Sequence, residues 1–117
     1  MTFIRFDKQA IAARSIIWLE GDWNYTRIYQ QDKPTKMSAY TLKWYQEQLA
    51  DFIRVRKDAI VNPQHIRAVL STPSQPRRLR LLLSNGDEVE VARRRQVFVK
   101  RRLQDGQYEK GPLHAAN

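Results

Sequence analysis

The chain has 117 residues, a length that suits one domain with one hydrophobic core and is too short for two independently stable domains. It contains no cysteine, so disulfides, thiolate metal sites and thiol catalysis are excluded. No apolar run approaches the roughly 18 residues that a membrane span requires, so we expect a cytoplasmic protein with no membrane insertion. Its 21 Lys and Arg against 12 Asp and Glu give a formal net charge of +9, with the excess gathered in Arg77–Arg80 and Arg93–Arg102. This clustering favours a polyanionic partner over a merely soluble basic surface.

Strands are predicted wherever a short apolar or β-branched run lies between turn residues. Gly21-Asp22 should end the first strand, and the two prolines of residues 72–76 predict a polar loop. Asn85-Gly86 should connect the last two strands as an antiparallel hairpin, because both residues accept positive φ. The predicted strands cover residues 15–19, 25–30, 36–40, 52–56, 59–61, 65–70, 79–83 and 88–91.

Two helices are predicted. Thr41 is a suitable N-cap for the first, whose apolar stripe of Leu42, Tyr45 and Leu49 is typical of core packing. Residues 92–103 predict the second, with cations in its last turns, where they suit the helix dipole. The chain therefore predicts a mainly β fold of antiparallel sheets with one short mid-chain helix and a C-terminal helix. The domain should span residues 1–104, and residues 105–117 should form a flexible C-terminal tail.

The sequence predicts no enzyme. Imidazole chemistry would depend on His65, because the other histidine, His114, lies in the predicted tail. We expect His65 to be hydrogen-bonded locally. The acidic residues are dispersed and the four glycines are scattered, so no catalytic residue, metal site or cofactor is expected.

The cationic segments carry the functional prediction. Arginine can fork onto guanine or onto phosphate oxygens, so Arg56-Lys57 on a loop and Arg93–Arg95 at a strand-to-helix junction are candidates for both kinds of contact. Asn24 and Tyr25 follow a turn and are candidates for contacts to base edges or sugar. The alternatives stay open: the arginines at the helix start are merely solvated, and Trp23 beside Asn24 covers the edge of a sheet.

Two ordered motifs carry a resemblance to a known family. The block FIRVRKDAIVN at residues 52–62, followed by VARR at residues 91–94, is similar to the paired patterns FIRxHRSxIVN and VSRR of the LytTR DNA-binding domain of bacterial response regulators. The likeness covers residues 15–103 and includes the segment from Ile16 to Tyr25. It implies an elongated assembly of antiparallel β-sheets that places loops, and no recognition helix, in successive major grooves. By the same likeness, the contacting loops lie around Asn24-Tyr25, Arg56-Lys57 and Arg93–Arg95.

The sequence departs from the family pattern at Arg56, where histidine is common, and at Asp58 and Ala92, where serine is usual. A carboxylate at Asp58 would repel phosphates unless it pairs with Lys57 or Arg56. Asn62 is expected to hold the turn before Pro63. Most family members carry a receiver domain ahead of this module, so we expect either an excised domain or a regulator controlled by another protein.

We therefore predict a bacterial transcriptional regulator that binds double-stranded DNA sequence-specifically, as two copies on paired repeats about one helical turn apart. Two alternatives stay open. One is an RNA-binding β module that stacks bases on Tyr25, Arg27 and Tyr29; the other is a basic module for an acidic protein or a membrane surface. Phosphate contacts are expected from Arg54, Lys57, Lys100 and Arg101. The full set of predicted DNA-binding residues is Asn24, Tyr25, Arg54, Arg56, Lys57, Arg93, Arg94, Arg95, Lys100 and Arg101.

Overall fold

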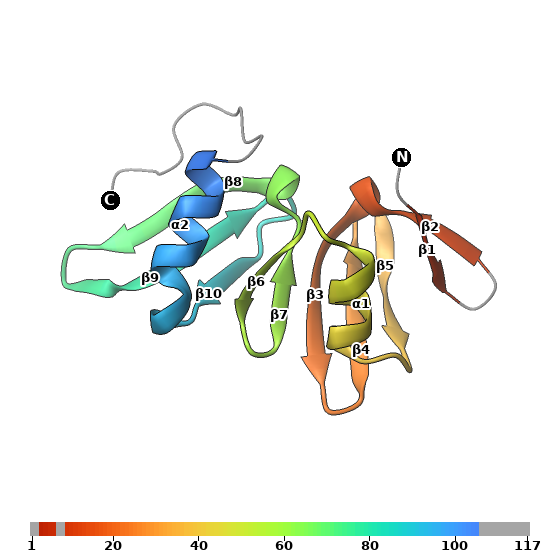
Figure 1. Ribbon diagram of the computed structural model, residues 1–117. Helices are drawn as coiled ribbons and strands as arrows, with labels where there is room; N and C mark the ends of the chain where they lie inside the picture. The colour runs from red at the N-terminus through yellow and green to blue at the C-terminus, as the bar shows by residue number, and fades with distance from the viewer. Residues whose placement is uncertain (1–2, 7–8, 106–117) are drawn as a thin grey trace.

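The computed structural model describes residues 3–6 and 9–105. Within them the chain is mostly β, with two α-helices and three short 3-10 turns, η1 to η3 (Figure 1). This confirms the predicted fold class. The predicted tail of residues 105–117 lies outside the described residues, apart from Asp105 at the end of α2. In chain order the elements are β1 (Phe3–Phe6), β2 (Gln9–Ala12), η1 (Ala13–Ser15), β3 (Ile16–Asp22), β4 (Tyr25–Gln30), β5 (Lys33–Ser38), α1 (Leu42–Gln48), β6 (Ile53–Arg56), β7 (Ala59–Val61), η2 (Pro63–His65), β8 (Ile66–Thr72), β9 (Gln75–Leu83), β10 (Glu88–Val91), η3 (Arg93–Arg95) and α2 (Gln96–Asp105).

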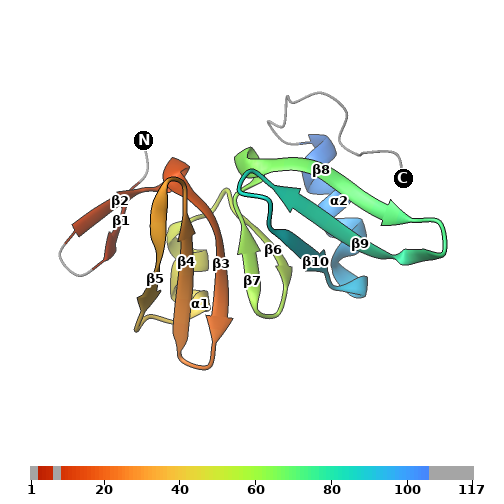
Figure 2. The same cartoon turned by 180° about the vertical axis from the view of Figure 1, so that it is seen from behind.

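The strands of the described residues form three antiparallel sheets. The largest has the order β5-β4-β3-β7-β6, the second the order β10-β9-β8, and β1 pairs with β2 alone. The two larger sheets lie beside each other along the long axis, and the β6–β7 hairpin is the part of the five-stranded sheet next to the second sheet (Figures 1 and 2). The molecule extends over 45 × 29 × 24 Å, so the elongated shape implied by the family resemblance is confirmed.

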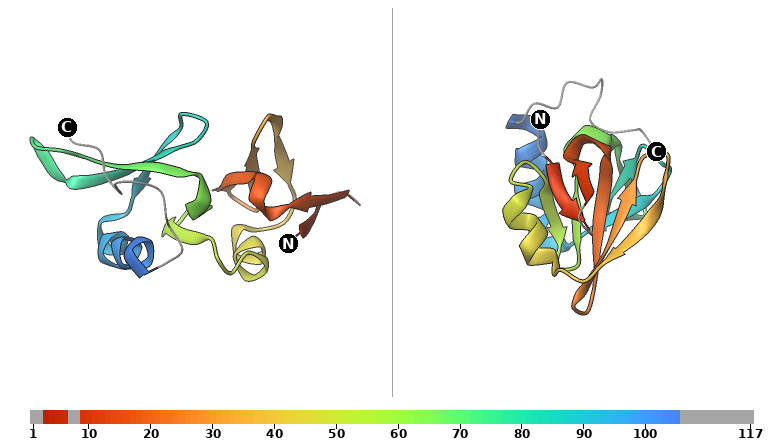
Figure 3. Two further views of the ribbon diagram at one scale, coloured as in Figure 1. Left: turned by 90° about the horizontal axis from the view of Figure 1, so that it is seen from above. Right: turned by 90° about the vertical axis from the view of Figure 1, so that its right-hand side faces the viewer.

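Both helices cover the same face of the molecule, one over each larger sheet, as the view from above shows (Figure 3). Tyr45 and Leu49 at α1 are buried in one core with residues of β3 and β4, such as Leu19 and Ile28. On α2, Val99 and Leu103 are buried in a second core with residues of β6, β9 and β10. Each of the two larger sheets therefore has its own helix, and the turns at the lower edge of Figure 1 project beyond these layers.

Local sequence rules account for β4 and α1. Along β4 the side chains of Thr26, Ile28 and Gln30 are buried while the alternate side chains are more exposed, the period of two expected for a strand. Thr41 caps α1 as predicted, since its hydroxyl oxygen accepts a hydrogen bond from the backbone N–H of Trp44 at 3.2 Å.

Three predictions in the first half of the chain differ from the structure. The first strand does not end at Gly21-Asp22 but continues through both, because the backbone N–H of Gly21 donates to the carbonyl of Asp58 at 2.8 Å. The strand predicted at residues 36–40 spans Lys33–Ser38, and Pro34 is tolerated because β5 lies at the edge of its sheet. The β1–β2 hairpin was not predicted.

Three further differences lie in the second half. Residues 72–76 do not form a long loop, because β8 and β9 pair up to Thr72 and Gln75. The predicted helix of residues 92–103 begins as an α-helix only at Gln96, after an extended Ala92 and the turn η3. The β9–β10 hairpin is confirmed, although Gly86 has a positive φ, 92°, and Asn85 does not.

Candidate nucleic-acid interface

Three turns that carry predicted DNA-binding residues lie along one edge of the molecule. They are the β3–β4 turn at Trp23-Asn24, the β6–β7 turn at Lys57-Asp58, and η3. All three lie along the lower edge in Figure 1 and in the reverse view of Figure 2. Antiparallel pairing of β3 with β7 brings the first two turns together, whereas η3 follows β10 of the second sheet.

Backbone hydrogen bonds fix the central β6–β7 turn to its neighbours on both sides. On one side the N–H of Gly21 in β3 donates to the carbonyl of Asp58 at 2.8 Å. On the other side the N–H of Ala92, just before η3, donates to the carbonyl of Val55 in β6 at 2.9 Å. The turns are therefore connected through the main chain, which makes their spacing a property of the fold and not of side-chain rotamers.

Arg56 reinforces this arrangement. Its Nε donates to Asp58 Oδ1 at 2.6 Å, its Nη2 lies 3.8 Å from Glu20 Oε2 on β3, and its Nη1 donates to the Glu90 carbonyl on β10 at 3.1 Å. One guanidinium thus links its own turn to both flanking elements, which the point charge of a lysine could not reproduce. The carboxylate of Asp58 is paired with Arg56, which is the pairing that a phosphate-facing loop needs at this position.

The side chain of Arg54 donates hydrogen bonds to backbone carbonyls of its own β6–β7 turn. Its Nε donates to the carbonyls of Arg56 and Lys57 at 3.1 and 3.2 Å, and its Nη1 donates to the side-chain oxygen of Gln46 on α1. Burial, and next the charge of Arg95, lower the pKa of Arg54 below its ordinary value. The guanidinium of Arg54 is thus used mainly to hold the tip at Lys57.

The remaining predicted cations point to solvent. The side chains of these residues are exposed and form no hydrogen bond or ion pair with other described residues: Lys57, Arg93, Arg94, Lys100 and Arg101. Arg95 differs, because its guanidinium carbon lies 5.6 Å from the ring centroid of Phe98, which Arg102 also approaches at 5.7 Å. The structure therefore separates exposed cations at tips and on α2 from arginines engaged in structural contacts.

The β3–β4 turn presents polar and aromatic side chains. Asn24 is exposed, and Tyr25 has 52% of its surface exposed. Trp23 is 95% exposed, so the interpretation in which its ring covers the edge of the sheet is wrong. The acidic residue of this turn, Asp22, pairs with Arg27 at 3.2 Å.

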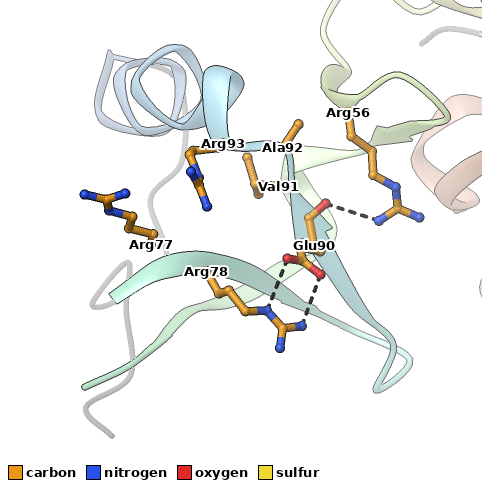
Figure 4. Close-up of a pocket in the computed structure, with 7 residues that line it drawn as sticks. All are labelled: Arg56, Arg77, Arg78, Glu90, Val91, Ala92 and Arg93. Carbon is orange, nitrogen blue, oxygen red and sulfur yellow. Dashed lines mark hydrogen bonds and ion pairs between the residues drawn. The ribbon is translucent and has the colours of Figure 1, made fainter. Parts of the chain in front are cut away.

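A hollow of about 490 Å³ lies beside η3 and brings together arginines that are distant in the chain (Figure 4). Arg77 and Arg78 of β9 line it with Arg56 and Arg93. Arg78 forks onto Glu90, with Nε–Oε2 and Nη2–Oε1 distances of 3.2 and 3.1 Å, so this carboxylate offsets part of the positive charge. Arg77 and Arg78 lie in the basic segment Arg77–Arg80 but were not predicted as site residues, because no motif pointed to them.

Comparison with known proteins identifies the family. The family model of the LytTR DNA-binding domain matches residues 4–104. The chain belongs to the LytTR family. A solved structure, the LytTR DNA-binding domain of a Bacillus cereus protein named as a methyl-accepting/DNA response regulator, has the same fold, with a TM-score of 0.70 and 24% identity over 88% of this chain and 94% of that one. No curated protein matches the chain.

Membership of the LytTR family supports DNA binding and transcription regulation, and LytTR domains are DNA-binding modules, not enzymes. In the part of the chain that the structure describes, no group of three or more His, Asp or Glu side chains is placed to hold a metal ion. No helix among these residues is long and apolar enough to cross a membrane.

Most of the LytTR motif at residues 52–62 is structural. Phe52, Ile53, Val55 and residues 59–61 are buried, so the apolar letters of the motif form core. Asn62 is 3% exposed and its Oδ1 accepts a hydrogen bond from the N–H of Gln64 at 3.0 Å, which confirms that it holds the turn at Pro63.

His65 is likewise bonded locally. Its ring nitrogens lie 2.7 Å from the Ser84 hydroxyl and 2.7 Å from the Arg14 carbonyl, as the interpretation of a locally bonded histidine predicts. Both ring nitrogens are therefore used in holding η2 against the neighbouring segments.

Because Arg78 and Glu90 form an ion pair, we expect the protein to lose a small part of its stability at acid pH. Hydrogen bonds from Arg78 lower the pKa of Glu90 below its ordinary value of 4.5. A carboxyl group with a lowered pKa in the folded state contributes stability above its unfolded pKa, and this contribution is lost as the pH falls through the folded pKa. We expect Glu90→Gln to reduce the drop in Tm between about pH 6 and pH 3 slightly, because the pair is exposed.

Glu47→Gln is the matched control, since Glu47 is exposed on α1 and forms no ion pair with described residues. The drop in Tm between about pH 6 and pH 3 should be smaller in Glu90→Gln than in Glu47→Gln. An equal drop in the two variants would contradict a stabilising role for the Arg78–Glu90 pair.

Proposed function

We propose that this LytTR domain, residues 1–104, regulates transcription by binding double-stranded DNA sequence-specifically, and that its turns read major grooves. The observation that supports this most directly is the row of three turns on one edge, each ending in exposed polar or cationic side chains. The links through Arg56 and the backbone hold these turns before DNA arrives, so little ordering entropy is lost on binding.

The dimensions suit contacts in successive grooves. One turn of B-DNA rises about 34 Å, and the long axis of the molecule measures 45 Å. A molecule of this length lying along the duplex would cover somewhat more than one helical turn, and the three turns lie within that length (Figure 1). We propose that two copies bind side by side on paired repeats about one helical turn apart.

We propose different roles for the cations. Arg93 and Arg94, exposed on η3, would fork onto guanine O6 and N7, while Asn24 would contact adenine. Lys57 at its tip, and Lys100 and Arg101 on α2, would contact phosphates. The engaged groups Arg54, Arg56 and Arg95 would act on DNA mainly through the geometry of the turns, with Tyr25 beside the sugar.

The structure favours double-stranded DNA over single-stranded RNA. A base-stacking platform on β4 would need free rings, yet Tyr29 stacks on Trp18 at 4.5 Å and donates to Glu20 at 2.8 Å. Burial, and next the hydrogen bond to Glu20, raise the pKa of the Tyr29 hydroxyl. Arg27 is paired with Glu20 and Asp22, so its guanidinium is already engaged and would have to leave these partners to stack on a base.

Such a regulator acts where bacterial DNA lies, so we place it in the cytoplasm. Control by a receiver domain, in the same polypeptide or in a partner protein, completes the proposal.

The test is selection of bound fragments from a random double-stranded DNA pool by the purified protein at about 150 mM salt, where non-specific binding is weak. A recovered motif that repeats at one-turn spacing is the expected result. An unenriched pool, with binding that vanishes as salt rises, would overturn sequence-specific recognition and favour a basic surface for an acidic protein or a membrane. Preference for single-stranded competitor would favour the RNA-binding alternative.

A further inference from the structure

Trp23 has an environment that folding alone does not explain. It is 95% exposed, whereas the other two tryptophans are packed: Trp18 stacks on Tyr29 at 4.5 Å, and Trp44 stacks on Tyr40 at 4.4 Å. No aromatic or cationic side chain of the described residues contacts the ring of Trp23. Single exposed apolar side chains are common on protein surfaces, so the exposure of this ring gains weight only from its backbone conformation and its place on the molecule.

The backbone at Trp23 is also strained. Its φ is +60°, in the left-handed region that disfavours residues with a large side chain. Trp23 is the first residue of the two-residue turn between Asp22 and Tyr25, where glycine is favoured when φ is positive. Strain of this kind persists where the surrounding structure imposes it, and it gathers at functional sites.

The position of the turn defines what the ring meets. The β3–β4 turn lies on the edge that also carries Lys57 and η3, so a duplex lying along those cations would receive the tip of this hairpin (Figure 1). In the major groove the apolar group that a base presents is the C5-methyl of thymine. Asn24, exposed beside Trp23, has the side chain that pairs with N6 and N7 of adenine.

We propose that Trp23 and Asn24 together read A·T base pairs, with the indole of Trp23 packed against a thymine C5-methyl and the amide of Asn24 bonded to adenine. This inference rests on the proposed DNA-binding function. It makes Trp23, which no motif indicated, a residue that determines sequence preference.

The first experiment compares Trp23→Gly with the unaltered protein. Glycine removes the ring and relieves the positive φ, so the Tm should be no lower than that of the unaltered protein. Affinity for the selected site should fall about ten-fold or more, because a large apolar contact is lost. The motif recovered by the variant should lose an A·T position. A marked fall in Tm would show that Trp23 serves folding and would overturn the proposal.

The second experiment removes the methyl group from the DNA. Replacing the contacted thymine by deoxyuridine should weaken binding of the unaltered protein about four-fold, which corresponds to the free energy of burying one methyl-sized group. The Trp23→Gly variant should bind the thymine site and the deoxyuridine site with the same affinity. If Trp23→Gly lowers the affinity for the thymine site and for the deoxyuridine site by the same factor, the ring packs on sugar or between bases, and the proposed thymine contact is wrong.

Asp32→Gly is the matched control, since Asp32 has a φ of 58° in the β4–β5 turn at the opposite end of β4. It should leave the recovered motif and the deoxyuridine effect unchanged. If the unaltered protein enriches no motif, the proposed function fails; if it enriches a motif that Trp23→Gly recovers with equal affinity, only the present inference fails.

Discussion

Replacing Asn62 by alanine is expected to lower the free energy of unfolding by about 2–4 kcal/mol, the largest effect of any polar substitution we propose. Asn62 is 3% exposed, and its Nδ2 donates to the Ile16 carbonyl at 2.9 Å while its Oδ1 accepts from the N–H of Gln64 at 3.0 Å. Alanine would remove the partner of the buried Ile16 carbonyl at the start of β3 and the side-chain acceptor of the Gln64 N–H in η2. Urea denaturation followed by circular dichroism measures the change.

Asn24→Ala is the control for this prediction, because Asn24 is exposed at the tip of the β3–β4 turn. Its stability should change by less than about 0.5 kcal/mol while its affinity for the selected DNA site falls. The Asn62 variant should behave in the opposite way, with reduced stability but normal affinity of the folded fraction. An Asn62→Ala protein that is as stable as the unaltered one and fails to bind DNA would show that this motif residue contacts DNA.

Elements fixed by local rules were predicted from the sequence. The alternation in residues 25–30 placed β4, and the cap at Thr41 with the stripe of Leu42 and Tyr45 placed α1, because side-chain period and capping depend on neighbours in the chain. The two strands predicted within the motif at residues 52–62 correspond to β6 and β7, which pair as a hairpin.

Strand ends set by distant partners were not predicted. Gly21 reads as a strand breaker, yet its N–H has a partner at Asp58, so β3 continues. Pro34 reads as a turn residue, yet an edge strand tolerates it. Such contacts join positions far apart in sequence, and no local pattern records them.

The residues of the candidate site were predicted as a set, but the sequence did not show which of its arginines are engaged in structural contacts. In the sequence Arg56 and Arg94 are alike, whereas in the structure Arg56 is bonded to Asp58 and to the Glu90 carbonyl and Arg94 faces solvent. Whether a guanidinium is free depends on acids and carbonyls that other strands supply. The exposure of Trp23 could not be predicted for the same reason, since whether an aromatic side chain beside a turn is packed depends on distant segments of the chain.

Replacing Arg94 by alanine should weaken binding to the selected site by about 1–3 kcal/mol and relax the preference at one base pair, if Arg94 forks onto guanine. Arg94 is exposed and without a partner among the described residues, so the variant should keep its Tm. Fluorescence anisotropy on the selected site and on single-base variants of it measures both affinity and preference.

Lys100→Ala provides the contrast, because a phosphate contact carries no sequence information. It should weaken binding to every duplex similarly and reduce the slope of log affinity against log salt by about one. Arg94→Ala, in turn, should change the affinity ratio between the selected site and its variants. If both substitutions change that ratio alike, the proposed separation of base contacts on η3 from phosphate contacts on α2 is wrong. Base recognition would then have to be assigned to the β3–β4 and β6–β7 turns.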